Sequence, residues 1–517
     1  MSHGINRRQF IGRVGAGAAA VSVPAFLARC AGKSGQLKPD PAPVSAHATY
    51  FDRFGVDAGL LRRTIERGLG QGGEFAEVFL QHKVNHWVGM EDGEVNRAYS
   101  EIALGAGVRV LKGDGTGFAF TEELTEPALL RAAATAAAVA DGTPSARPLP
   151  LAATPIESAY QIEVPWTEVG IDRKLPRVER AEALARARDP RIIKVTVYIE
   201  DETSHILVAN SEGRLVEDLQ PMAVLSVICV GEDKGKTETG YQSAAARDGL
   251  PFFSEATLAR VAEESADFTT LLFNARPAPV GELPVVLAPG VTGILLHEAI
   301  GHGMEADFNR KGVSIYADRI GQRVGPELVT IVDDGTMPRL RGSINIDDEG
   351  MPTQRTTLVE RGILRSYMHD RLSARHYGIE TTGSGRRQSF RYPPVPRMRN
   401  TTMLNGPHHP DEIIASVKRG LYAENFSNGQ VNIGAGDFTF YLKHGRLIED
   451  GKLTHVVKDA NLIGSGPKVL EQIDMVGDDM ALHSGAGWCG KDGQRVAVGF
   501  GLPTVRARGM SIGGRQS

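Results

Sequence analysis

The strongest constraint on the fold is the spacing of turn signals in the second half of the chain. From Leu328 onwards, short runs typical of strands are separated by two-residue turn signals that end in glycine. Examples are Asp334-Gly335, Glu349-Gly350, Asp450-Gly451 and Asp492-Gly493. Repeated turn signals of this kind favour a large, mostly antiparallel sheet. The chain contains 60 glycines, which cluster in this half and fit a region of tight turns and close backbone approach.

The first half of the chain has a different pattern, in which strands and helices alternate. Strands are predicted at residues 75–80, 100–104, 107–111, 193–200 and 223–230. Helices are predicted at residues 127–139, 177–188 and 254–272, and Ser254 is suited to cap the last of them. The sequence therefore predicts an α+β fold, with an N-terminal mixed α/β domain followed by a strand-rich, largely antiparallel C-terminal domain.

The length of the chain predicts more than one domain, because 517 residues are too many for one compact core. A Pro-rich stretch at residues 275–281 separates the two patterns and predicts a domain boundary. A stretch rich in Pro, Ser and Ala near the N-terminus predicts a linker. The predicted organisation is a signal peptide at 1–31, a linker at 32–50, an N-terminal α+β domain at 51–276 and a β-rich C-terminal domain at 280–517.

The N-terminus has the pattern of an export signal. Arg7-Arg8 is followed by Gln9-Phe10-Ile11 and by an apolar run of small residues, which predicts export by the twin-arginine route to the periplasm. The run is too short and too rich in Ala and Gly for a membrane-spanning helix, so no transmembrane span is expected. Cys30 ends a stretch similar to a lipoprotein box. Lipid anchoring at Cys30 is therefore an alternative, although Arg29 stands where a small residue is expected.

Charge and cysteine content argue against several classes of protein. The chain has 58 basic and 62 acidic residues, a net charge of −4 and no basic block, so nucleic acid is not an expected partner. Three cysteines, Cys30, Cys229 and Cys489, are too few for a disulfide framework. The sequence has no haem-attachment motif and no cysteine-rich cluster site, which argues against an exported redox protein.

The motif with the most chemical content is LLHEAIGHG at residues 295–303. It is similar to the zinc-protease helix H-E-x-x-H, but His297 and His302 are five positions apart instead of four. At about 100° per residue, an α-helix would turn the second imidazole roughly 140° away from the first. Either a π-helical turn at Gly301 returns His302 to the side of His297, or the helix ends at Gly301 and His302 comes from a loop. The alternative to a metal site is a pair of packing histidines.

A third ligand is available far downstream, at Cys489, which lies in a glycine-rich stretch. Two imidazoles and one thiolate, with a fourth position left for water, form a catalytic zinc arrangement. Glu298, next to His297, is then placed to take a proton from that water. The alternative for Cys489 is a small buried hydrophobic residue. His483, six residues before Cys489, is a candidate for binding substrate or supporting a ligand, with a plain loop histidine as the alternative.

The residues around these positions resemble a known family. Residues 107–121, 208–213, 297–311, 345–350 and 489–494 are similar to the HExxxH-bearing TldD branch of the TldD/PmbA metalloprotease family. The resemblance extends from about residue 55 to the end of the chain. It implies one zinc ion per chain, held by His297, His302 and Cys489, with Glu298 as the base. Residues 280–517 would then be the zinc peptidase domain.

The resemblance also implies an activity and a partner. The expected activity is zinc-dependent hydrolysis of flexible or unfolded peptides, in a homodimer or in a heterodimer with a PmbA-like subunit. The alternative is a non-catalytic scaffold or partner subunit of the same fold. The intact set of His297, Glu298, His302 and Cys489 argues against this alternative, because a silent branch is expected to lack the motif. The export signal departs from the best-known relatives, which are cytosolic and pair with a metal-free PmbA-type protein.

Overall fold

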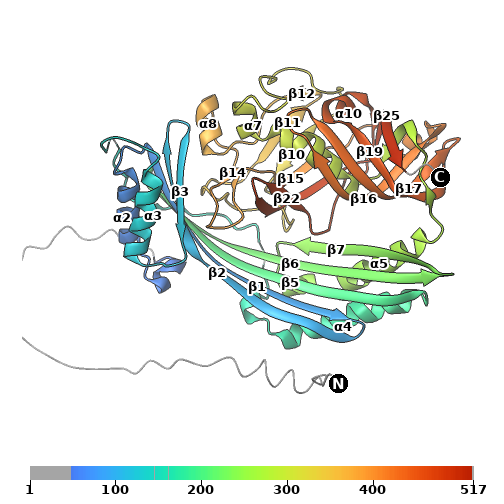
Figure 1. Ribbon diagram of the computed structural model, residues 1–517, viewed down its shortest axis with the longest axis horizontal. Coiled ribbons are helices and arrows are strands. Elements are labelled where there is room, and N and C mark those ends of the chain that lie inside the picture. The colour runs from blue at the N-terminus through green and yellow to red at the C-terminus, as the bar shows by residue number, and fades with distance from the viewer. Residues whose placement is uncertain (1–47, 145, 161, 515–517) are drawn as a thin grey trace, which may run out of the picture. The chain divides into compact units, whose positions relative to one another are not determined.

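The computed structural model describes residues 48–144, 146–160 and 162–514 (Figure 1). The predicted signal peptide, nearly all of the predicted linker and Cys30 lie outside the described residues. Within them the fold is α+β, as the sequence predicts, with strand-rich sheets after the mixed first half. No helix of the described ranges combines the length and apolar content that a membrane crossing requires.

The first half of the described chain is built on a 7-stranded sheet, in the order β3-β2-β1-β5-β6-β4 with β7 paired to β6. The two strands predicted at 100–104 and 107–111 are one strand, because the register with β1 continues unbroken through Gly105. The β1–β2 hairpin closes at Asp92-Gly93, whose φ values of 50° and 80° suit a two-residue turn. The strands are β1 (Phe75–Glu91), β2 (Glu94–Lys112), β3 (Gly115–Thr121), β4 (Ala152–Ala153), β5 (Ile192–Asn210), β6 (Arg214–Asp233) and β7 (Lys236–Ala246).

Helices in two groups bury their apolar sides against this sheet (Figure 1). α2 (Ala58–Leu69) and α3 (Glu126–Ala137) cover the β1–β2–β3 end, and α4 (Ile171–Arg188) and α5 (Glu255–Leu272) cover strands β5 to β7. Ser254 caps α5, as predicted, by accepting the Thr257 N–H. α4 begins earlier than the predicted start at residue 177 and contains Pro176, and Leu175 and Val178 on either side of this proline bury their side chains in the core.

Two large sheets form the second half. An 8-stranded sheet has the order β16-β9-β25-β19-β17-β18-β8, with β20 paired to β25, and the extra β16–β17 pairing closes β16, β9, β25, β19 and β17 into a ring. Its strands are β8 (Arg276–Pro277), β9 (Gly281–Leu287), β16 (Arg419–Val431), β17 (Asp437–Glu449), β18 (Lys452–Lys458), β19 (Ala460–Ser465), β20 (Ile473–Val476) and β25 (Val505–Gly514). A 6-stranded sheet has the order β12-β11-β10-β15-β24-β21. Its strands are β10 (Ile331–Asp334), β11 (Arg355–Glu360), β12 (Ile363–Leu364), β15 (Asn400–Met403), β21 (Ala481–Leu482) and β24 (Gly499–Leu502).

Short elements complete the second half. Two small hairpins are formed by β13 (Gly385–Arg386) with β14 (Val395–Pro396), and by β22 (Trp488–Lys491) with β23 (Gln494–Ala497). Short helices connect the strands along the chain: α6 (Ile294–Leu296), α7 (Ala306–Arg310), α8 (Arg371–Tyr377), α9 (Pro410–Ala415) and α10 (Gly466–Gln472). An apolar core includes side chains of both large sheets and those around the HEAIGH motif, and a smaller cluster contains Val286, Ile413, Val417 and Ile448.

The predicted turn signals have mixed outcomes. Asp450-Gly451 and Asp492-Gly493 close the β17–β18 and β22–β23 hairpins, with positive φ at both residues of each pair. Asp334-Gly335 does not close a hairpin, because Asp334 ends β10 and the antiparallel partner β11 begins only at Arg355. The preceding Asp333 is fully buried and is held by an arginine, which is an interaction between segments far apart in the sequence.

Candidate metal centre

The HEAIGH segment is a π-helical turn, which confirms the first of the two predicted geometries. β9 leads through a short turn into α6, where Leu295 and Leu296 are buried and anchor the segment in the core. The π-helical turn spans His297–Gly301, and His302 begins a 3₁₀ turn that continues to Met304. The extra residue is thereby absorbed, and the rings of His297 and His302 lie 5.1 Å apart at 81°.

The structure brings the three predicted ligands together. Cys489 lies on β22 and is fully buried, and its Sγ is 3.5 Å from His302 Nε2. One ligand atom from each of His297, His302 and Cys489 lies within 4.8 Å of the others. Two ligands of a tetrahedral zinc ion, bonded at about 2.0–2.3 Å, are separated by about 3.5 Å. The thiolate and imidazole therefore have the spacing that one shared ion requires.

His297 provides a separate test of whether these residues suit a metal ion. Its side chain is only 1% exposed, and neither ring nitrogen has a hydrogen-bond partner among the described residues. A buried imidazole without a partner is costly, and a metal ion bonded to one nitrogen would remove part of that cost. His297 therefore fits a ligand better than a packing histidine.

Cys489 is prepared for ionisation by its neighbours. Burial raises the pKa of its thiol, but the imidazoles of His302 and His297 outweigh burial and bring the pKa well below its ordinary value. Metal ions bind the thiolate form of cysteine, so this environment favours the form that coordinates. The alternative of an inert buried cysteine does not explain two imidazoles placed around the sulfur.

Glu298 lies beside the three ligands and retains access to solvent. Its Oε2 is 3.7 Å from His302 Nε2, and 17% of its side chain is exposed, compared with 5% for His302. A carboxylate at the rim of a buried ligand set can accept a proton from a water molecule held there. The position is that expected for a general base.

Two residues that the sequence analysis missed support the ligands. Glu305 accepts a hydrogen bond at 2.9 Å from Nδ1 of His302, which leaves Nε2 free to face Cys489. Lys491 lies 3.2 Å from Glu305 and 2.7 Å from Asp307. Burial opposes ionisation of Glu305, but Lys491 and His302 lower its pKa to about 2. The sequence contains one sign that Lys491 lies near the ligands. Lys491 is two positions after Cys489, so in a strand the two side chains point to the same face.

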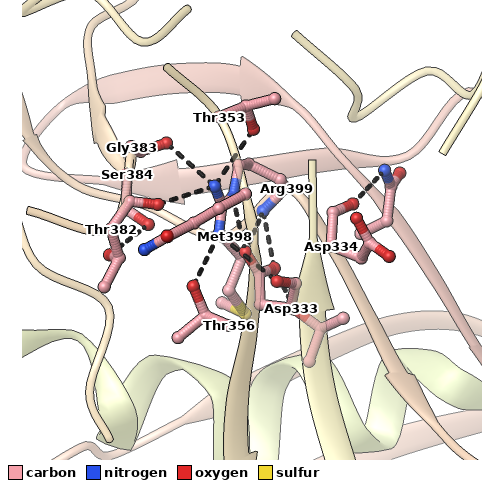
Figure 2. A network of polar contacts seen from close by, with 12 residues as sticks. Asp333, Asp334, Thr353, Thr356, Thr382, Gly383, Ser384, Met398 and Arg399 are labelled. Atoms are coloured by element: carbon pink, nitrogen blue, oxygen red, sulfur yellow. Dashed lines mark hydrogen bonds and ion pairs between the residues drawn. The ribbon is translucent and has the colours of Figure 1, made fainter. Parts of the chain in front are cut away.

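Gly301 allows close packing behind the π-helical turn. A Cβ at Gly301 would lie 2.2 Å from Sδ of Met398, which is fully buried. The next residue, Arg399, is fixed by a polar network that reaches Asp333, Thr353, Thr356, Thr382 and Gly383 (Figure 2). The network therefore holds the segment on which the ligand helix rests.

His483 is not part of the ligand set. Its ring stacks on Phe500 at a centroid distance of 4.9 Å, and Phe500 in turn lies 6.1 Å from the His297 ring. Burial lowers the pKa of His483 to about 4, so the ring is neutral near pH 7. The ring of Phe500 is thus a neighbour of both His483 and His297. The role of His483 in substrate binding stays a prediction.

Comparison with known proteins identifies the family. Models of PmbA/TldA metallopeptidase domain 1, the central domain and the C-terminal domain match residues 76–140, 164–273 and 280–514. The metalloprotease TldD homologues of Buchnera aphidicola (strain APS) and Haemophilus influenzae are each 39% identical over 449 residues. These alignments cover 85% of this chain and 93% of each relative.

A more distant relative and a solved structure agree with this result. A metalloprotease of Methanothermobacter thermautotrophicus is 33% identical over 433 residues, covering 82% of this chain and 92% of the relative. The fold matches the crystal structure of TldE from Thermococcus kodakarensis with a TM-score of 0.69 at 19% identity, covering 88% of this chain and 99% of that one. The chain thus belongs to the PmbA/TldA (TldD/PmbA) metallopeptidase family.

Proposed function

We propose that the protein is a zinc-dependent metallopeptidase that hydrolyses flexible or unfolded peptides. The observation that carries the proposal is the convergence of His297, His302 and Cys489, with a buried His297 whose ring nitrogens have no partner in the described chain. Two imidazoles and one thiolate are typical of catalytic zinc, because a fourth position stays available. Relatives that cover most of the chain are named metalloproteases.

Each residue of the centre has a distinct task in this proposal. His297, His302 and Cys489 would hold one zinc ion per chain, which, when bound, supplies Lewis-acid polarisation of water and of the peptide carbonyl. Glu298 Oε2 accepts a proton from the attacking water and delivers it to the leaving amine. Glu305 keeps the Nδ1 proton of His302 in place, so that Nε2 remains a ligand atom.

We also propose a partner and a location. The fold similarity to a TldE protein supports an assembly of two chains, either a homodimer or a heterodimer with a PmbA-like subunit. The twin arginine at Arg7-Arg8 supports export to the periplasm. Mass measurement of the purified periplasmic form would test both proposals, since it reports the assembly state and whether residues 1–31 are removed.

The decisive experiment measures zinc content and cleavage of an unfolded peptide for the wild type, Glu298→Gln and His297→Ala. Zinc near one per chain is expected in the wild type and in Glu298→Gln, with cleavage in the wild type alone. His297→Ala is expected to lose both. Glu471→Gln and His455→Ala, at exposed positions, are the matched controls and should behave as the wild type. A wild type that holds no zinc and cleaves no peptide would favour the non-catalytic scaffold instead. Full cleavage by Glu298→Gln would reject Glu298 as the base.

A further inference from the structure

A cavity of about 260 Å³ lies where the sheet of the first half meets the β22–β23 hairpin. Gln81, Ser204 and Met222 line it from the sheet, and Arg341 and Trp488 line it from the other side. It is far larger than the roughly 10–15 Å³ that one water molecule occupies on this measure. Trp488 in its wall is 46% exposed.

Three buried arginines in the cavity wall lack a carboxylate partner. Arg247, Arg341 and Arg386 are each 4% exposed, and no carboxylate of the described chain forms an ion pair with any of them. Their hydrogen bonds go to carbonyl oxygens, such as those from Arg341 Nε to Gly487 at 3.0 Å and from Arg386 Nη2 to Ala497 at 2.8 Å. Nη1 of Arg341 has no hydrogen-bond partner among the described residues.

The positive charge of this wall persists at neutral pH. Burial lowers the pKa of Arg341 and of Arg386 to about 10, so both guanidinium groups stay protonated at pH 7. Unpaired buried charges of this kind are strongly unfavourable in a folded protein. A ligand that carries a negative charge would relieve this cost.

The acidic residues of the cavity wall are mostly engaged by other groups. Asp201 binds Lys174 and His86, and Glu202 lies 3.3 Å from Lys83. Asp348 accepts the backbone N–H of Arg387 at 2.7 Å, and its carboxylate lies near Arg386 and Arg247 without forming an ion pair with either. Burial raises the pKa of Glu200, and the nearby Arg341 opposes this rise, although the two side chains form no ion pair.

The cavity and the ligand set share one strand. Trp488 and Cys489 are neighbours on β22 and therefore point to opposite faces of the hairpin. Cys489 faces His302, and the guanidinium of Arg341 lies 4.5 Å from the centre of the Trp488 ring. The cavity wall and the ligand set are therefore connected through adjacent residues of one short hairpin.

We propose that this arginine cavity, defined by Arg247, Arg341, Arg386 and Trp488, binds a carboxylate of the peptide that is cut at the metal centre. The proposal rests on the proposed peptidase function and names the feature by which peptides are selected. Guanidinium groups bind carboxylates through charge-assisted hydrogen bonds. The carboxylate has two sources, the C-terminus of the peptide or an Asp or Glu side chain.

The test measures peptide binding to the full-length, zinc-loaded Glu298→Gln variant by calorimetry, so that hydrolysis is not needed. The first pair of probes is acetyl-pentaalanine with a free C-terminal carboxylate and the same peptide as its amide. The second pair is acetyl-Ala-Ala-Glu-Ala-Ala-amide and its Gln counterpart. The charged member of at least one pair is expected to bind about tenfold more tightly or better. Preference in the first pair identifies the chain end, and preference in the second identifies the side chain.

Single substitutions then test whether the cavity arginines cause the preference for charged peptides. Arg341→Gln is expected to abolish the preference for the charged peptide, and Arg341→Lys to restore part of it. Arg365→Gln is the control, because Arg365 is half exposed and pairs with Glu360 elsewhere on the surface. Equal affinity for charged and uncharged probes would overturn the proposal, as would an unchanged preference in both Arg341→Gln and Arg386→Gln.

The test can reject the arginine cavity and the proposed peptidase function independently of each other. If Arg341→Gln does not fold, the comparison of charged and uncharged probes on Glu298→Gln still decides whether a carboxylate is recognised. Zinc binding and cleavage with no charge preference would retain the peptidase and reject the arginine cavity. A charge preference without zinc or cleavage would retain the cavity as a carboxylate site and reject the peptidase.

Discussion

At the scale of single residues, Gly301 shows why the metal centre tolerates so little change. Its φ of −58° is ordinary helical geometry, so the π-helical turn does not depend on the conformational freedom of glycine. The constraint is space, because a Cβ would approach Met398 Sδ to 2.2 Å. The prediction of the π-helical turn is thus confirmed, and Gly301 matters in it because it leaves room for Met398.

Gly301→Ala is therefore expected to weaken zinc retention. The added methyl group must displace Met398 from a fully buried position, at a cost of about 1–3 kcal/mol in the free energy of unfolding. Zinc competition with a chelator and thermal unfolding measure the two effects. Gly490→Ala is the control, since no described residue other than its two chain neighbours has an atom within 4 Å of a Cβ placed there. Equal zinc retention by the two variants would contradict the packing argument.

Glu305→Gln tests the support given to His302. The amide oxygen can still accept the Nδ1 proton, but the negative charge opposite His302 and Lys491 is lost. Removing a carboxylate behind a metal-binding histidine typically costs 10–100-fold in metal affinity, and we expect a loss of this order. Zinc dissociation constants of Glu305→Gln and of the exposed control Glu471→Gln would measure it. An unchanged constant would show that Glu305 only fills space.

At the scale of elements, one buried ion pair lies at the residue that precedes β15. Arg399 donates to Asp333 from its side chain at 2.8 Å and also from its backbone at 2.8 Å, and both residues are fully buried. Arg399→Met leaves Asp333 charged and unpaired, so a loss of about 3–5 kcal/mol in unfolding free energy is expected. The double variant with Asp333→Asn should lose less than the sum of the single variants. Additive losses in denaturant unfolding would rule out the coupling.

Among the elements and contacts of the fold, some can be predicted from the sequence and others cannot. The helix 254–272 follows from capping and periodicity, and the proximity of His297, His302 and Cys489 follows from the motif and the family resemblance. The ion pair of Asp333 cannot be predicted in this way, because its partner Arg399 is 66 positions away in the sequence. Glu305 was missed for a related reason. Its spacing from His302 is visible, but its role depends on Lys491, which only the fold brings near.

At the scale of the whole described chain, buried charges join the first and second halves. Arg109 of β2 binds Glu77 of β1 at 2.8 Å and Glu349 of the second half, and Arg387 binds Glu77 from the other side. These side chains are almost fully buried, so each charge needs its partner. The sequence motif around Glu349 predicted a turn, and the turn also carries an acid that connects the two halves.

A second contact between the halves makes their association sensitive to pH. Asp218 of β6 accepts a hydrogen bond at 2.8 Å from the side chain of Asn345, and burial raises the pKa of Asp218 to about 6. In the unfolded chain the pKa is about 4. Between these values the folded protein retains a proton that the unfolded chain has released. The free energy of unfolding therefore falls as pH rises from about 4 to 6, and the loss is complete above pH 6.

Asp218→Asn is expected to remove this dependence. In the wild type, Asp218 should lower the free energy of unfolding by up to about 3 kcal/mol between pH 4 and pH 7, and the variant should lack this component. Denaturant unfolding at several pH values measures it, with Asp141→Asn at an exposed position as the control. The same slope in Asp218→Asn and the wild type would show that the carboxylate stays ionised across this range. In that case Asn345 and Gln220, which both donate to Asp218, stabilise its charge more than burial opposes it.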